Sequence, residues 1–155
     1  MEKFHNLSRD LKAENLIRET KILNIARLAK MLIDLYGQDK PFTKIGEHEG
    51  KEIELYLKEL DGYITFILTS DKDNFNCHAE KAKNPIASII VNVKEEEILK
   101  VISNIIRLKH NIIGVIKLLK YILPGKIRIK GSYIAALKLA RCLMIGKHYM
   151  YKESK

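Results

Sequence analysis

The residue types that most often carry out chemistry are present in this sequence, but their spacing forms no catalytic or metal-binding pattern. Cys77 and His78 are adjacent, yet neighbouring side chains of a strand point to opposite faces, so the pair makes poor joint ligands for zinc. The histidines lack the H-E-x-x-H spacing, and no glycine-rich phosphate loop of either common type is present. We therefore predict no enzymatic activity, no cofactor and no metal site.

Three cations alternate with apolar residues at the start of the stretch 125–146, GKIRIKGSYIAALKLARCLMIG. The alternation predicts a strand with Lys126, Arg128 and Lys130 on one face and two isoleucines on the other. Ser132 follows a glycine and is the expected N-cap of a helix that carries apolar residues at helical spacing. A strand, a tight turn and an apolar-faced helix are therefore expected at this end of the chain.

The positive charge of the chain lies in its second part. The 155 residues carry a net charge of +9, yet residues 1–93 hold 14 Lys and Arg against 15 Asp and Glu. Residues 94–155 hold 14 basic residues against 4 acidic ones. Such an imbalance indicates either a surface that meets phosphate groups or simply a solvated basic face.

The start of the chain, MEKFHNLSRDLKAEN, is charged and has no apolar core of a signal peptide. The most apolar stretch, 112–123, is interrupted by Lys117 and Lys120 and is too short to span a bilayer. Two widely separated cysteines are more typical of a reduced, intracellular chain than of a disulfide scaffold. We expect a soluble, cytoplasmic protein.

Periodicity predicts an α+β fold in a single domain, 1–155. Helical spacing covers 7–37, as one helix or two, and the sheet with its remaining helices is expected over 50–146. Alternating or β-rich runs predict strands at 52–57, 63–68, 75–79 and 86–93, which we interpret as an antiparallel meander. Helices at 94–106 and 112–123 precede the basic strand. The result is a five-stranded, mainly antiparallel sheet covered on one face by helices.

This order of elements resembles the sterol-carrier-protein type two family of lipid-binding domains. The resemblance covers 50–143 and rests on Asp61-Gly62-Tyr63, on the strand 86–93 with the acidic helix start after it, and above all on GKIRIKGSYIAALKL at 125–139. The chain departs from the family in an additional apolar helix within 104–123 and in a long N-terminal helix. The resemblance implies non-covalent binding of an apolar ligand between the sheet and the helices.

If that implication holds, helical phase and strand alternation select ten residues as the lining of the ligand site, although each of them could equally be ordinary core. They are Phe66, Ile98, Val101, Ile102, Ile105, Ile113, Ile116, Ile129, Leu137 and Met144. Five cations are the predicted contacts to an anionic membrane or phosphate: Lys117, Lys120, Lys126, Arg128 and Lys130.

The leading hypothesis is an intracellular carrier for a fatty acyl, isoprenoid or sterol-like molecule. The serious alternative is an interaction or dimerisation module that binds no ligand, with its apolar helices covered by a protein or by a second copy. Nucleic-acid binding through the basic strand is a weaker alternative, because the other strands face outward with Glu52 and Glu54 and no alternation of aromatic and basic residues repeats across neighbouring strands.

Overall fold

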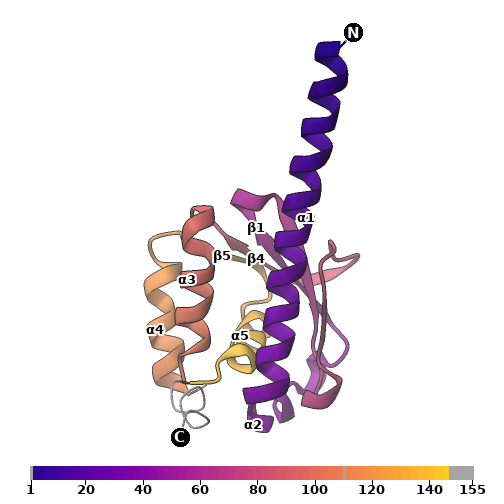
Figure 1. Ribbon diagram of the computed structural model, residues 1–155. Helices are drawn as coiled ribbons and strands as arrows, with labels where there is room; N and C mark the ends of the chain where they lie inside the picture. The colour runs from indigo at the N-terminus through magenta and orange to yellow at the C-terminus, as the bar shows by residue number, and fades with distance from the viewer. Residues whose placement is uncertain (1, 110, 147–155) are drawn as a thin grey trace, which may run out of the picture.

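In a computed structural model that describes residues 2–109 and 111–146, one long helix lies across a sheet and extends well beyond it (Figure 1). This helix, α1 (Glu2–Tyr36), is one continuous helix, where the sequence allowed either one helix or two. Residues 2–17 are all exposed, whereas Ile22, Ala26 and Ile33 are buried on one face. The second half of α1 therefore packs on the sheet, and the first half projects from the body.

The sheet has the strand order β3-β2-β1-β4-β5. Its strands are β1 (Glu52–Leu57), β2 (Gly62–Ile67), β3 (Asn76–His78), β4 (Pro85–Val91) and β5 (Ile127–Gly131). Each neighbouring pair is antiparallel except β1 and β4, which are parallel. The predicted five-stranded, mainly antiparallel sheet is thus confirmed, but the antiparallel meander is wrong, because β4 pairs with β1 and not with β3.

The strand order results from a short connection, residues 79–84, that runs over the outer face of the sheet from β3 to β4. From the end of β3 the chain passes β2 and β1 before it enters the sheet again as β4, a distance of about three strand spacings, or roughly 14 Å. Thr65 of β2 donates a hydrogen bond to the carbonyl of Glu80 at 2.7 Å. The backbone N–H of Ala82 donates to Glu54 at 3.1 Å, and that of Asn84 donates to Glu52 at 3.0 Å. The outward-facing carboxylates of β1 therefore hold the crossing segment.

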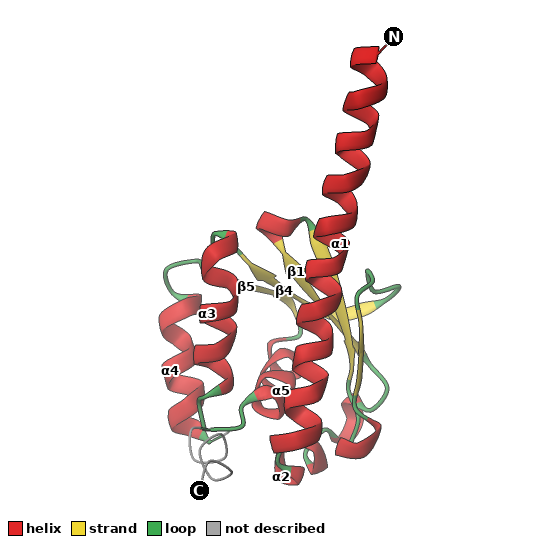
Figure 2. Cartoon of the chain, viewed as in Figure 1, coloured by secondary structure: helices red, strands yellow, loops and turns green. Residues whose placement is uncertain are grey.

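Helices cover the opposite face of the sheet, as Figure 2 shows. They are α2 (Asp39–Thr43), α3 (Glu95–Ile106), α4 (Ile112–Ile122) and α5 (Tyr133–Leu143), and short 3₁₀ turns lie at Gly46–His48, Lys58–Leu60 and Lys72–Asn74. The predicted N-cap of α5 is confirmed, since the Ser132 hydroxyl accepts from the N–H of Ala135 at 3.2 Å. In Figure 1, α3 and α4 lie side by side, and α5 lies between them and α1.

A glycine allows α1 to approach the sheet closely. Gly62, part of the Asp61-Gly62-Tyr63 stretch on which the family resemblance rests, is buried at the start of β2. A Cβ atom at this position would lie 1.8 Å from Cδ1 of Ile22 on α1. The absence of a side chain at Gly62 therefore leaves the space that Ile22 of α1 occupies against the strand.

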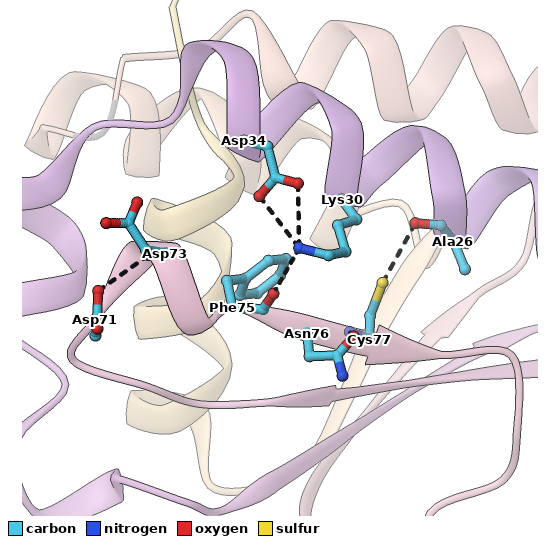
Figure 3. Close-up of polar contacts among 8 residues, drawn as sticks. All are labelled: Ala26, Lys30, Asp34, Asp71, Asp73, Phe75, Asn76 and Cys77. Carbon is cyan, nitrogen blue, oxygen red and sulfur yellow. Dashed lines mark hydrogen bonds and ion pairs between the residues drawn. The ribbon is translucent and has the colours of Figure 1, made fainter.

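Polar contacts fix α1 to the edge strand (Figure 3). Lys30 pairs with Asp34 one turn later at 3.1 Å and also donates to the carbonyl of Phe75 at 3.1 Å. The thiol of Cys77 on β3 donates to the carbonyl of Ala26 at 3.3 Å. The second half of α1 is thus held by backbone acceptors as well as by apolar packing.

The contrast between the two halves of α1 makes a stability prediction. Ile33 is 1% exposed and Leu11 is 53% exposed. Ile33→Ala should lower the free energy of unfolding by about 2–5 kcal/mol, because it leaves a cavity in the core. Leu11→Ala should change it by no more than about 0.5 kcal/mol. Urea unfolding of both variants measures the difference, and equal losses would contradict the division of the helix.

Candidate functional site

An apolar cavity lies between the sheet and the helices. Its volume is about 110 Å³, and every side chain that lines it is apolar. Residues from α1, β1, β2, β4, β5, α3, α4 and α5 all contribute. The cavity is therefore built at the meeting point of most elements of the fold.

The inner face of the sheet forms the floor of the cavity. Alternation along each strand turns Leu55 and Ile64 toward the helices, and these two residues are register partners across β1 and β2. Ile89 and Ile129 form the corresponding pair across β4 and β5. Ile89 and Ile129 are only half-buried although they face the helices, because the cavity lies against them.

The helices form the roof and walls. One face of α3 contributes Val101, Ile102, Ile105 and Ile106. The other contributors are Ile25 and Ala29 of α1, Leu118 and Ile122 of α4, and Ala136, Leu137, Leu139, Ala140 and Leu143 of α5. Small side chains at Ala29, Ala136 and Ala140 leave the space that the larger residues surround.

Six of the ten residues selected from the sequence line this cavity. They are Phe66, Val101, Ile102, Ile105, Ile129 and Leu137. Ile98 is buried but lies in a separate groove between α1 and α3, and Met144 is fully buried outside the lining. The structure therefore brings together the residues chosen on β2, β5 and α5 and most of those chosen on α3.

Ile113 and Ile116 lie away from the cavity. They are 55% and 60% exposed on the outer surface of α4. The buried face of this helix is instead formed by Gly114, Leu118 and Tyr121. Because α4 is apolar around nearly its whole circumference, periodicity alone does not say which stripe faces inward.

Sequence reasoning missed the contribution of α1 and the small residues of α5. Ile25 and Ala29 share a helical face with the buried Ala26 and Ile33, so the period of α1 carried the signal. Ala136 and Ala140 are one helical turn apart on α5 and both line the cavity. In a sequence, alanine in a helix indicates helix propensity and gives no sign of a cavity beside it.

The five cations predicted to contact phosphate are all exposed. Lys117 and Lys120 lie on α4, and Lys126 precedes β5. Arg128 and Lys130 point to the outer face of the sheet, because Ile127 and Ile129 of the same strand point inward. Lys138, a further cation of this basic region, is instead held within the body by the carbonyl of Ile45 at 2.9 Å and the ring of His48.

Both cysteines are free thiols with depressed acidity. Burial raises the pKa of Cys142 to about 12. Burial also raises the pKa of Cys77, which lies between the sheet and α1 (Figure 3). Since the thiolate is the reactive form, neither environment activates a cysteine nucleophile.

Within residues 2–109 and 111–146, no group of three or more His, Cys, Asp and Glu side chains is placed to hold a metal ion. Over the same described ranges, none of the helices combines the length and the apolar character needed to cross a bilayer.

The fold is α+β and sterol-carrier-like. The UbiJ-SCP2 ubiquinone synthesis protein is a solved structure with this fold, matched with a TM-score of 0.52 and 12% identity over 80% of this chain and 93% of that chain. A lesser likeness, with a TM-score of 0.42 and 10% identity, is to the stereoselective inverting sec-alkylsulfatase Pisa1 from Pseudomonas sp., over 72% of this chain and 15% of that one. No protein-family model matches the sequence, and no curated protein matches it.

The raised pKa of Cys142 predicts a loss of stability in alkali. The native thiol keeps its proton up to about pH 12, whereas an unfolded thiol loses it near its ordinary pKa of 9.0. The stabilisation is therefore complete below pH 9 and is lost progressively as the pH rises toward 12. Denaturant unfolding of the wild type should show this decline, and Cys142→Ala should lack its cysteine component. Parallel profiles for the two proteins would contradict the assignment.

Proposed function

We propose that this protein is a non-enzymatic lipid-binding or carrier module that holds an apolar ligand between the sheet and helices α3, α4 and α5. The observation that carries the proposal is a cavity with an entirely apolar lining at the centre of a sterol-carrier-like fold. The UbiJ-SCP2 neighbour, named as a ubiquinone synthesis protein, supports a lipid-related role by analogy of fold.

The lining favours hydrocarbon and disfavours polar groups. An apolar ligand gains about 25 cal/mol for each Å² of its surface that leaves water. A polar group placed among these side chains would lose its hydrogen bonds to water at a cost of about 1–3 kcal/mol, because the lining offers no partner. A ligand with a polar head would therefore place its tail inside and its head at the surface.

The size of the cavity requires movement for a long ligand. An apolar cavity of about 150 Å³ accommodates benzene, and sites for larger ligands usually span about 300–1,000 Å³. The 110 Å³ present here therefore fits only a small apolar group as the helices stand. At the start of α3, Glu95 forms an ion pair with Lys21 of α1. At its end, the carbonyl of Ile106 accepts a hydrogen bond from the backbone N–H of Ile145 at 2.8 Å. We expect α3 and α4 to shift away from the sheet when a long ligand enters.

Contact with an anionic membrane is the second part of the proposal. Lys117 and Lys120 lie on a helix whose exposed apolar residues include Ile112 and Ile116. An amphipathic surface of this kind suits the interface of a bilayer, where each cation contributes on the order of 1 kcal/mol. The carrier would take up or release its ligand there.

Blocking the cavity tests the ligand-binding proposal. Ala140→Phe should fill the space from α5 and reduce the amount of bound apolar ligand at least about tenfold, because the ligand and the ring compete for one volume. Native mass spectrometry of the purified protein, followed by organic extraction and a mixed lipid panel, measures the ligand. Ala13→Phe is the matched control, since Ala13 is exposed on the projecting half of α1.

A co-purifying fatty acid, isoprenoid or sterol that is lost in Ala140→Phe and kept in Ala13→Phe is the expected result. A wild-type protein that carries nothing and takes up no lipid from the panel would contradict the carrier role. In that case the interaction module would become the better account.

That alternative rests on the exposed apolar residues of α1. Phe4, Leu7 and Leu11 continue the face that packs on the sheet, yet they lie on the projecting half of the helix and are exposed. A partner helix or a second copy could cover them. Analytical ultracentrifugation of the wild type and of Leu7→Glu with Leu11→Glu tests the second copy, since a monomer in both cases leaves dimerisation through this face without support.

A further inference from the structure

A basic groove lies between α3 and α4, apart from the apolar cavity. Its volume is about 650 Å³. The residues that line it are Asn104, Arg107, Leu108, Lys109, Ile113, Gly114, Lys117, Lys120 and Tyr121, and none of them lines the cavity. Four of the nine are cations and none is acidic, so the groove presents concentrated positive charge on a concave surface.

The four cations have no counter-ions within the described chain. In residues 2–109 and 111–146 the ion pairs are those of Lys21 with Glu95 and of Lys30 with Asp34, and neither involves the groove. Lys120 instead lies over the ring of Tyr121, with its Nζ 5.7 Å from the ring centroid. The charges of Arg107, Lys109 and Lys117 therefore remain available to an anion.

Arg107 is the groove residue with an unpartnered buried nitrogen. Its Nε atom is buried and has no hydrogen-bond partner. Buried donors are normally paired, and an arginine side chain in particular presents a fork of donors that matches two oxygens of a phosphate. A phosphate oxygen in the groove would supply an acceptor for this fork of donors once the guanidinium turns toward it.

The backbone between α3 and α4 fixes the position of Lys109. A Cβ atom at Gly114 would lie 1.7 Å from the carbonyl oxygen of Lys109, so the turn after α3 packs directly on the first turn of α4. The Asn111 side chain caps that turn by accepting from the N–H of Gly114 at 3.2 Å. Lys109 is thus held at the junction of α3 and α4, where it lines the same groove as Arg107.

We propose that the groove between α3 and α4 is a binding site for a phosphate group, with Arg107 and Lys117 as its principal ligands and Lys109 and Lys120 beside them. The phosphate belongs either to a lipid headgroup in a membrane or to a soluble phosphate compound. Exposed apolar residues of α4, among them Ile112 and Ile116, border the cations and would contact the acyl region if a headgroup is bound. The inference deepens the membrane-contact part of the proposed function and does not depend on the cavity.

Pyrophosphate is the probe for the shared chemistry. Titration into the ¹⁵N-labelled full chain at about 0.15 M ionic strength, where unspecific attraction is screened, should shift the amide signals of α3 and α4. Arg107→Gln with Lys117→Gln should raise the dissociation constant for pyrophosphate at least about tenfold, because two charge-assisted contacts are lost. Lys51→Gln with Lys83→Gln removes the same charge from exposed positions elsewhere and should change it less than about twofold.

Vesicles distinguish the two sources of phosphate. The same variants are sedimented with phosphatidylglycerol vesicles and with phosphatidylcholine vesicles. If binding to phosphatidylglycerol falls together with pyrophosphate binding, the site takes a lipid headgroup. If vesicle binding is unchanged while pyrophosphate binding is lost, the site takes a soluble phosphate.

Equal weakening in the groove pair and the control pair would overturn the proposal, and so would pyrophosphate shifts that lie outside α3 and α4. Lys120→Gln, at an exposed position, provides a second variant should the double substitution disturb the fold. The apolar ligand extracted from the groove pair should match that of the wild type. Failure of the groove and failure of the cavity are therefore separate results.

Discussion

The crossing of the chain from β3 to β4 is the constraint on which the rest of this structure depends. Glu52 and Glu54 accept hydrogen bonds from the backbone of the crossing segment, and Glu54 is only 7% exposed. A buried carboxylate needs such partners, because an unpaired charge out of water is strongly unfavourable. The two glutamates therefore stabilise the one path that brings β4 next to β1 and places β5 beyond it.

Both sites follow from that path. With β4 and β5 added beyond β1, the inner face of the sheet extends far enough to carry Ile89 and Ile129 as part of the cavity floor. The connection from β4 to β5 begins and ends beside the same end of the sheet, and it contains α3 and α4, which cover the inner face. Their inner surfaces cover the cavity, and the surfaces turned away from it form the basic groove. One pair of helices thus separates an apolar site from a cationic one.

The elements of this fold could be predicted from the sequence more completely than their arrangement. Alternation gave β1 its observed bounds, and Ser132 marked the start of α5. The parallel pairing of β4 with β1 escaped prediction, because it depends on the hydrogen bonds that Glu52 and Glu54 accept from the crossing segment. These bonds exist only once that segment lies over β1. In the sequence, two outward glutamates read as a solvated strand face.

The same limit applies to the candidate site. Residues on strands and on the strongly one-sided α3 could be assigned to the cavity, since their period leaves one inward face. On α4 the apolar residues surround the helix, so the sequence contained no choice between Ile116 and Leu118 as the inward residue. Arg107 escaped notice for a different reason, because its significance lies in an unpaired nitrogen and in neighbours from another helix.

The most direct test of the account is an NMR measurement of contacts between a ¹³C-labelled acyl chain and the methyl groups of the protein. The central claim is that the space between the sheet and α3, α4 and α5 holds an apolar ligand. It predicts intermolecular NOEs from the chain to methyls of Ile105, Leu118 and Ile129, which come from three different elements around the cavity. NOEs confined to exposed methyls such as those of Ile116 or Leu11, with none to the three cavity residues, would contradict it.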